Sequence, residues 1–298
     1  MDGILPLWKP KGFTSHDCVS KARGMLRMKK IGHTGTLDPD VEGVLPLCVG
    51  KATKIVPFLT DTDKVYEAVV TLGYSTDTED AGGNQVETLS VDKPVDKTQI
   101  KETLRSFEGR ITQTPPMYSA VKVNGRRLYE YAREGKVIER PTRHVTIKEI
   151  ALTSVDESVQ NGTFSFSFRA VCSKGTYIRT LCVDIGKALG FPAHMSSLVR
   201  TKTGGIEKGD CYTFDQLQEA ADEGRISEFL LPLQRGLTHL PVLEVTEAEQ
   251  AMIANGRVLE EPDNFSEDVF VVSRLDTALA IYQKHPEKPG KIKPVRVF

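Results

Sequence analysis

Apolar residues recur along the chain with two different periods, which together predict both strands and helices. Residues 65–73 and 164–168 alternate apolar and polar side chains, the pattern of a half-buried strand. A helix is expected to start near Ile178, because apolar side chains follow at helical spacing as far as Leu189, and Gly190 then supplies a C-terminal stop. The strand over 65–73 places four side chains on one face: Tyr66, Ala68, Val70 and Leu72.

The N-terminal segment predicts a compact alternation of strands and helices. Residues 4–12 are typical of a short strand that ends in a turn, after which Thr14 or Ser15 caps a helix. A second strand is expected over 44–50, followed at once by another helix.

Two changes in composition divide the chain. In residues 111–142 aromatic and basic side chains interleave with little apolar periodicity, which is typical of an arm lying on a ligand and equally of a long surface loop. After Gly236 the remaining residues carry strand and turn signals of their own and end in a basic, proline-rich tail. We therefore expect a large domain over 1–236, with an inserted arm, and a small β-rich module over 237–298.

Composition excludes several classes of protein. With 298 residues, 39% of them hydrophobic, the chain can build a substantial core, and no apolar stretch approaches the roughly 18 residues of a membrane span. The first residues lack the pattern of a secretory signal, so the cytoplasm is the expected compartment. The five cysteines are widely spaced and contain no Cys-x-x-Cys pair, which indicates small buried hydrophobes instead of disulfides or a zinc site.

The charge distribution matters more than the net charge of −1. Acidic residues dominate residues 61–102 and 207–228, so the folded chain can present one cationic face while its sum stays near zero. Each basic cluster taken alone could equally be a solvated surface. The basic residues gather in these segments: 21–30, 126–133, 140–143, 200–202 and 284–296.

The segment with the clearest chemical character is the glycine- and proline-punctuated turn over residues 32–42. Such a turn holds side chains outward at fixed angles, so that Asp38 can act as a nucleophile or base and His33 can donate a hydrogen bond or pack on a flat group. An aspartate before a proline is also a common turn initiator, so this turn alone does not decide between chemistry and packing.

A second candidate lies where the strand over 164–172 meets the following helix. Lys174, Tyr177 and Arg179 lie at this junction, where backbone N–H groups and cationic side chains favour an anion. Arg179 could instead pair with an acid in the first helical turn.

Six short motifs, taken together and in this order, resemble the bacterial TruB family, the tRNA pseudouridine-55 synthases. They cover about the first two hundred residues, and six matches in sequence are far more specific than any one of them. The motifs occupy these positions: 8–12 (WKPKG), 32–39 (GHTGTLDP), 50–54 (GKATK), 66–68 (YEA), 116–122 (PMYSAVK) and 173–179 (SKGTYIR).

The resemblance implies a fold and a reaction. The fold would be an α+β pseudouridine synthase domain with a large mixed sheet, a cleft across it and the arm near 111–142, followed by a PUA-like RNA-binding module. The reaction would isomerise one uridine in the tRNA T-loop, position 55, to pseudouridine, with the base flipped out of its stack. Neither a metal nor an organic cofactor is implied. The expected partner is the T-arm of tRNA, with no membrane and no obligate protein partner, and the protein is expected to be a monomer.

The resemblance also assigns roles to individual residues. Asp38 matches the essential aspartate, and the sequence leaves open whether it attacks the ribose, attacks the uracil or removes a ribose proton. Arg179 would pair with Asp38 and keep it ionised. Tyr66 would stack on the flipped base and assist a proton transfer. The remaining pocket positions are His33, which would brace the vacated stack, and Tyr177 and Leu198, which would line the uracil pocket.

Basic residues near these motifs are candidates for contacts with RNA phosphates. They are Lys9, Lys54, Arg126, Arg127, Lys174 and Arg200.

Two alternative functions stay open. The catalytic subunit of a guide-RNA particle would share the Asp38 turn, but such proteins usually carry charged extensions that this chain lacks. A tRNA-binding or folding factor with dispensable catalysis would need the same cationic face and arm. Asp38, Tyr66 and Arg179 are all present, which favours retained catalysis.

Overall fold

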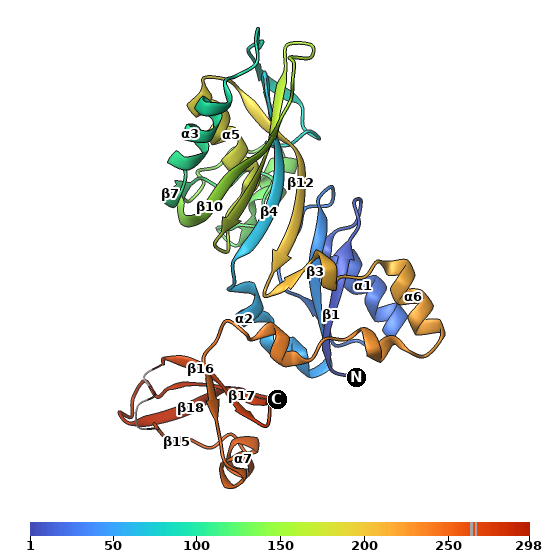
Figure 1. The fold of residues 1–298 in the computed structure, drawn as a ribbon, viewed down its shortest axis with the longest axis vertical. Coiled ribbons are helices and arrows are strands. Elements are labelled where there is room, and N and C mark those ends of the chain that lie inside the picture. The colour runs from blue at the N-terminus through green and yellow to red at the C-terminus, as the bar shows by residue number, and fades with distance from the viewer. Residues whose placement is uncertain (263–264, 266) are drawn as a thin grey trace. The chain divides into compact units, whose positions relative to one another are not determined.

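The contacts of the computed structural model divide the chain into two compact units. The structure describes residues 1–262, 265 and 267–298. The central unit is Asp63–Thr201, and the terminal unit combines Met1–Thr62 with Lys202–Phe298 (Figure 1). We describe each unit by itself.

The central unit is built on a sheet with the strand order β12-β4-β11-β10-β7. Strands β4 and β11, β11 and β10, and β10 and β7 pair antiparallel. Two helices, α3 and α5, pack against this sheet (Figure 1). The bounds are β4 Lys64–Leu72, β5 Tyr74–Thr76, β6 Gln85–Thr88, α3 Lys97–Ser106, β7 Gly109–Gln113, β10 Arg143–Val155, β11 Phe164–Cys172, α5 Ile178–Leu189 and β12 Ala193–Thr203.

Burial confirms the elements that periodicity predicted in this unit. Phe164, Phe166 and Phe168 on β11 are almost wholly buried, while the serines between them are only partly buried. Helix α5 buries its predicted apolar face and ends at Gly190, whose φ of 86° is the left-handed value expected of a C-terminal glycine. The four predicted side chains of β4, from Tyr66 to Leu72, are also buried.

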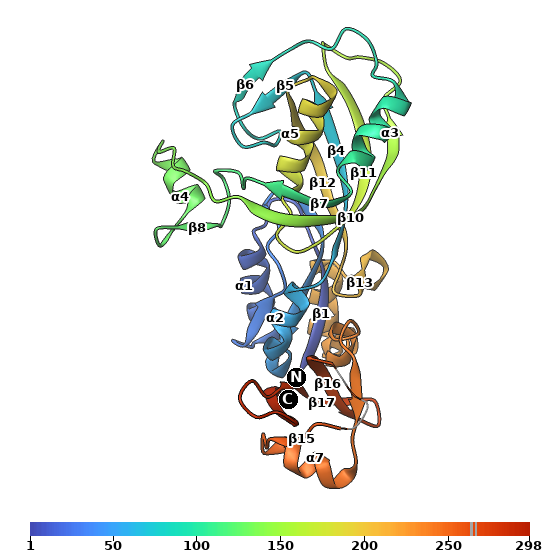
Figure 2. The same ribbon diagram turned by 90° about the vertical axis from the view of Figure 1, so that its left-hand side faces the viewer.

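The inserted arm joins β7 to β10 and projects from the sheet where β7 ends and β10 begins (Figure 2). Residues 111–113 belong to β7, so the arm itself spans 114–142. Its guanidinium groups lie over its own tyrosine rings: the guanidinium carbon of Arg126 is 4.7 Å from the ring centroid of Tyr131, and that of Arg133 is 5.2 Å from that of Tyr129. The arm contains β8 Lys122–Val123, β9 Arg126–Arg127 and α4 Leu128–Arg133.

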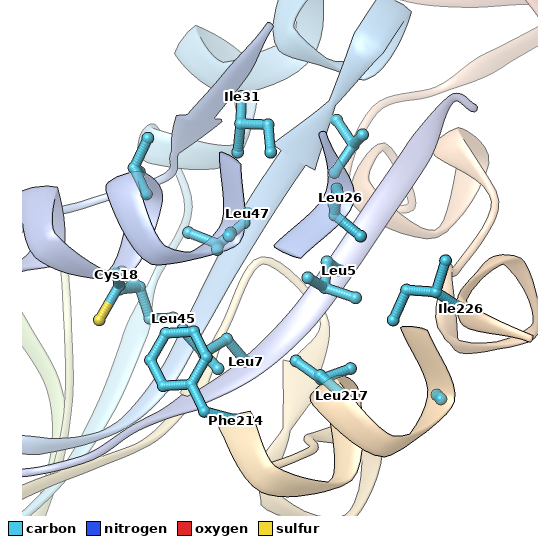
Figure 3. Close-up of a cluster of buried hydrophobic side chains, with 14 residues drawn as sticks. Leu5, Leu7, Cys18, Leu26, Ile31, Leu45, Leu47, Phe214, Leu217 and Ile226 are labelled. Carbon is cyan, nitrogen blue, oxygen red and sulfur yellow. The ribbon is translucent and has the colours of Figure 1, made fainter. Parts of the chain in front are cut away.

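The N-terminal part of the terminal unit packs strands β1 and β3 against helices α1 and α6. Thr14 caps α1, as predicted, by accepting a hydrogen bond from the backbone of Asp17. Figure 3 shows Leu5 and Leu7 of β1 meeting Leu217 of α6 in one apolar cluster. The bounds are β1 Gly3–Lys9, α1 Ser15–Leu26, β2 Ile31–His33, β3 Glu42–Val49, η1 Gly50–Ile55, α2 Val56–Thr60, β13 Ile206–Glu207, η2 Lys208–Asp210, α6 Phe214–Asp222, η3 Ile226–Phe229 and η4 Leu233–Gly236.

The C-terminal part of the terminal unit is a five-stranded sheet in the order β14-β16-β17-β18-β15. Strands β14 and β16 pair parallel, whereas the other neighbours pair antiparallel. The α+β fold and the β-rich character predicted for residues 237–298 are therefore confirmed. The bounds are β14 Val242–Glu244, α7 Glu247–Ala254, β15 Leu259–Glu260, β16 Val269–Arg274, β17 Thr277–Lys284 and β18 Lys291–Val297.

Four of the five cysteines are buried, as the sequence indicated, and Cys211 is partly buried. Burial raises the pKa of Cys48 to about 12, which keeps this thiol protonated and inert at neutral pH. In the described part of the chain, no helix has both the length and the apolar character of a membrane span.

Candidate active site

The turn that carries Asp38 connects β2 to β3 in the terminal unit and is fixed on both sides. The backbone N–H of Leu37 donates to the Ser15 hydroxyl at 2.9 Å, and that of Val41 donates to the Asp38 carbonyl at 3.1 Å. Leu37 and Val41 are buried, whereas Asp38 between them is only partly buried. The turn therefore holds the backbone of Asp38 in a defined place at the margin of the core.

A buried ammonium group also stabilises this turn. Lys9, at the end of β1, has no exposed surface, and its Nζ donates to the carbonyls of Pro10 at 2.9 Å, Phe13 at 2.6 Å and Pro39 at 3.0 Å. The backbone N–H of Gly12 also donates to the Pro39 carbonyl, at 2.9 Å. The prediction that Lys9 contacts RNA phosphate is corrected here, because its charge is satisfied inside the protein next to Asp38.

His33 ends β2, where it pairs with Leu47 of β3. Its Nδ1 accepts a hydrogen bond of 3.4 Å from the backbone N–H of Gly35, which folds the ring back over the turn. The side chain is partly buried. This places His33 and Asp38 on one short connection of one unit.

The other three predicted pocket residues belong to the central unit. Tyr66 lies on β4, and Leu198 lies on the neighbouring strand β12. Tyr177 is the residue that precedes α5. Its backbone N–H donates to Oε1 of Gln113 at 3.0 Å, and its carbonyl accepts from Nε2 of Gln113 at 3.1 Å. The Gln113 amide thus forms two hydrogen bonds with the backbone of Tyr177, as a neighbouring strand would. The sequence did not indicate this role.

Arg179 lies in the first turn of α5, and its side chain is 5% exposed. It donates to the carbonyl of Thr78 at 2.9 Å and to that of Tyr118 at 2.8 Å, and its Nη1 lies 3.5 Å from a carboxylate oxygen of Asp80. Arg179 therefore does pair with an acid, which comes from the loop after β5 and not from its own helix. Its pairing with Asp38, which belongs to the other unit, stays a prediction.

The loop that meets Arg179 is itself tied to two elements. The Thr180 hydroxyl donates to the Glu79 carboxylate at 2.7 Å, and the backbone of Glu79 accepts from the N–H of Met195 on β12 at 3.0 Å. Burial raises the pKa of Glu79, while the Thr180 hydrogen bond opposes that shift. The signal for this loop in the sequence is the polar run Thr76-Asp77-Thr78-Glu79-Asp80, which only folding brings to Arg179.

The remaining basic candidates fall into different environments. Arg200 is 1% exposed, so its predicted contact with RNA phosphate is corrected like that of Lys9. Lys54 donates to the carbonyl of Val297 in β18 at 2.6 Å, so this ammonium group links η1 to the C-terminal sheet. Lys174 and Arg127 are exposed, and Arg126 is ion-paired with Glu134. For Lys54, Arg126, Arg127 and Lys174 the RNA contact stays a prediction.

Comparison with known proteins decides the family. The family model "TruB family pseudouridylate synthase (N terminal domain)" matches residues 23–178, and "tRNA pseudouridylate synthase B C-terminal domain" matches residues 179–238. The chain belongs to the TruB family. Among curated relatives in this family, tRNA pseudouridine synthase B of Oceanobacillus iheyensis is 58% identical over 100% of this chain and 98% of its own. The Bacillus subtilis protein of the same name is 51% identical, with the same coverage.

Solved structures give the same answer for the fold. A Cbf5-Nop10-Gar1 complex contains a chain that is 28% identical to this TruB family member, with a TM-score of 0.74 over 99% of this chain and 83% of the other. An H/ACA RNP bound to a substrate RNA containing 2'-deoxyuridine gives 25% identity and a TM-score of 0.76 over 99% and 84%. The protein is therefore an RNA isomerase by family.

Among the described residues, no cluster of three or more His, Cys, Asp or Glu side chains has an arrangement that could hold a metal ion.

Proposed function

We propose that the protein converts the uridine at position 55, in the T-loop of tRNA, to pseudouridine. The observation that carries the proposal is the Asp38 turn of this TruB family member. Hydrogen bonds from Lys9 and Val41 and to Ser15 fix the backbone of that turn. The substrate follows from the relatives, which are named as tRNA pseudouridine synthases and match the whole chain. A tRNA substrate also favours the cytoplasm as the compartment.

The proposed reaction breaks the N-glycosidic bond of the flipped uridine and rejoins the base through carbon. Asp38 supplies the carboxylate, which attacks the ribose, attacks the uracil or removes a ribose proton. Arg179 would keep that carboxylate ionised, since a guanidinium favours the charged form of a neighbouring acid. The arrangement around Arg179 supports this role, because two carbonyls and Asp80 fix its guanidinium in one orientation.

The base itself would be held by flat and apolar surfaces. Tyr66 would stack on the uracil, and Tyr177 and Leu198 would line the pocket. His33 would brace the stack that the flipped nucleotide leaves. The hydrogen bond from Gly35 to His33 supports these roles, because it orients the imidazole ring. The two hydrogen bonds between Gln113 and the Tyr177 backbone support them as well, because they fix the main chain that carries the Tyr177 ring.

We further propose that residues 1–236 carry the catalysis and that residues 237–298 form a PUA-like module for RNA. Contacts of such a module with phosphate and sugar would increase the affinity for tRNA and fix its position, without taking part in the cleavage of the glycosidic bond. We also propose that the protein works as a monomer without an obligate protein partner, in contrast to the Cbf5 chain, which was solved in a complex.

The deciding experiment uses the purified full-length chain and an unmodified tRNA transcript with no other protein. We expect pseudouridine at one position, 55, when the product is mapped by reverse transcription after carbodiimide treatment. Asp38→Asn should abolish turnover while changing tRNA affinity by no more than a few-fold, because the amide keeps the shape of the carboxyl but not its reactivity. Product from a verified Asp38→Asn protein would refute the role of Asp38. No product from the wild-type chain would favour a binding or folding factor.

A further inference from the structure

Arg143 is a cation beside Tyr177 that none of the recognised motifs contains. It is the first residue of β10 and pairs across the sheet with Gln113, the last residue of β7. Its guanidinium carbon lies 5.2 Å from the centroid of the Tyr177 ring, and its Nη1 lies 3.5 Å from the carbonyl of Gly175. The cross-strand pair therefore meets Tyr177 twice, because Gln113 binds its main chain and Arg143 covers its ring.

The charge of Arg143 is not neutralised within the described part of the chain. Its side chain is partly buried, yet no carboxylate there lies within ion-pair distance of it. Arg169 on β11 is different, because it forms a 2.8 Å ion pair with Glu149. A guanidinium that is partly withdrawn from water, without a counter-ion, favours an external anion.

The surroundings strengthen this preference for an anion. Lys174 is exposed on the same turn, next to Gly175. The turn leads into the N-terminus of α5, a helix of 12 residues that no side chain caps. The partial positive charge of a helix N-terminus adds to the field of the two cations. A guanidinium that lies over a ring still carries several N–H groups, which can bind two oxygens of one phosphate.

We propose that Arg143 binds a phosphate of the RNA backbone next to the target nucleotide while its guanidinium stays over the ring of Tyr177. This inference rests on the proposed function, since it takes Tyr177 as a wall of the base pocket. One residue would thus connect the position of the backbone to the position of the base. Such a contact contributes affinity and register but no sequence preference.

The salt dependence of binding tests the phosphate contact. We would measure the affinity of the full-length protein for a T-arm hairpin over a range of salt concentrations. Arg143→Gln should reduce the slope of log affinity against log salt by about 0.7 to 0.9, the value for one phosphate contact, whereas Arg143→Lys should keep the slope because it keeps the charge. The matched control is Arg169→Gln, which removes a guanidinium already paired with Glu149 and should leave the slope unchanged.

The same contact can be tested from the RNA side with the wild-type protein, so a variant that fails to fold does not decide the matter. Methylphosphonate linkages would neutralise the phosphates around the target uridine one at a time. One of them should reduce the slope by the same amount as Arg143→Gln and should have no further effect on that variant. An unchanged slope with every neutral linkage would overturn the proposal.

A purely structural role for Arg143 would give a different pattern. Arg143→Gln and Arg143→Lys would then both slow the single-turnover rate at saturating RNA, with an unchanged slope, and this result would also overturn the phosphate contact. Failure of the proposed function is recognised separately, as absence of pseudouridine with the wild-type chain, and leaves the binding slopes interpretable.

Discussion

At the scale of single residues, the unexpected feature is Lys9, a fully buried lysine whose ammonium group donates to three backbone carbonyls. Sequence alone suggested a surface cation at Lys9, because lysine is almost never fully buried without partners. Its three carbonyl partners include Pro39, thirty positions along the chain, and only the folded structure brings them together. Gln113, Asp80 and Tyr118 were missed for the same reason, since each is an ordinary polar or aromatic residue until it meets Tyr177 or Arg179.

The Lys9 contacts predict coupled effects on stability and turnover. Lys9→Met should lower the free energy of unfolding by about 1–3 kcal/mol, because three carbonyls lose hydrogen bonds from the buried ammonium. Turnover should fall further than the folded fraction does, since the Pro39 carbonyl, which is adjacent to Asp38, loses one of its two donors. Urea unfolding and initial rates on tRNA would measure the two effects. The control is Lys11→Met, at an exposed position two residues away. If the Lys9 variant turns over at the wild-type rate per folded molecule, Lys9 does not position Asp38.

At the scale of elements, local pattern predicted well where neighbours in sequence decide the structure. The alternation of β11 and the apolar face of α5 were visible because each element buries one face along its own length. Junctions between elements were not visible. His194, at the start of β12, packs at a tilt against the ring of Tyr74 in β5 with 4.3 Å between ring centroids, and its Nδ1 lies 3.1 Å from the Tyr74 carbonyl. No period in the sequence marks this contact.

The His194 contact predicts a dependence of stability on pH. Burial lowers the pKa of His194 below its ordinary value of 6.5, against the raising effects of the Tyr74 carbonyl and of Asp80. The unfolded chain therefore takes up a proton first as the pH falls, and the free energy of unfolding should decrease from pH 6.5 downward until the folded pKa is reached. Urea unfolding at several pH values should show this decrease, and His194→Gln should reduce it. His285→Gln, at the residue that follows β17, serves as the control. A pH profile of His194→Gln identical to the wild type would exclude His194 as the source.

At the scale of the whole chain, the C-terminal sheet shares a core with the first sixty residues. Val271, Ala278 and Ile281 of the sheet belong to the same buried cluster as Ile4 and Ile55. Two further contacts cross the predicted boundary at Gly236: the Lys54 ammonium donates to the Val297 carbonyl, and the Gln234 amide donates to the carbonyl of Asp276 at 2.7 Å. The composition of residues 237–298 indicated a separate module but could not show this shared core. An apolar residue in the sequence does not reveal which segment of the chain will cover it.

This shared core changes what removal of the module is expected to do. A fragment ending at Gly236 should unfold at a lower urea concentration than the full chain, because it exposes apolar side chains that the sheet now covers. In the full chain, Ile281→Ala should cost about 2–5 kcal/mol as a smaller version of the same loss, whereas Leu275→Ala, at a site that is 79% exposed, should cost almost nothing.

Catalysis should nevertheless stay with the folded part of the fragment, because Asp38, Tyr66, Tyr177, Arg179 and Leu198 all precede residue 236. Turnover of a T-arm hairpin, measured per folded molecule by circular dichroism and pseudouridine mapping, should match the full chain at low temperature, while affinity for whole tRNA should be weaker. Equal urea midpoints for fragment and full chain would show that the sheet adds nothing to the core. A folded but inactive fragment would place an essential part of the site beyond Gly236.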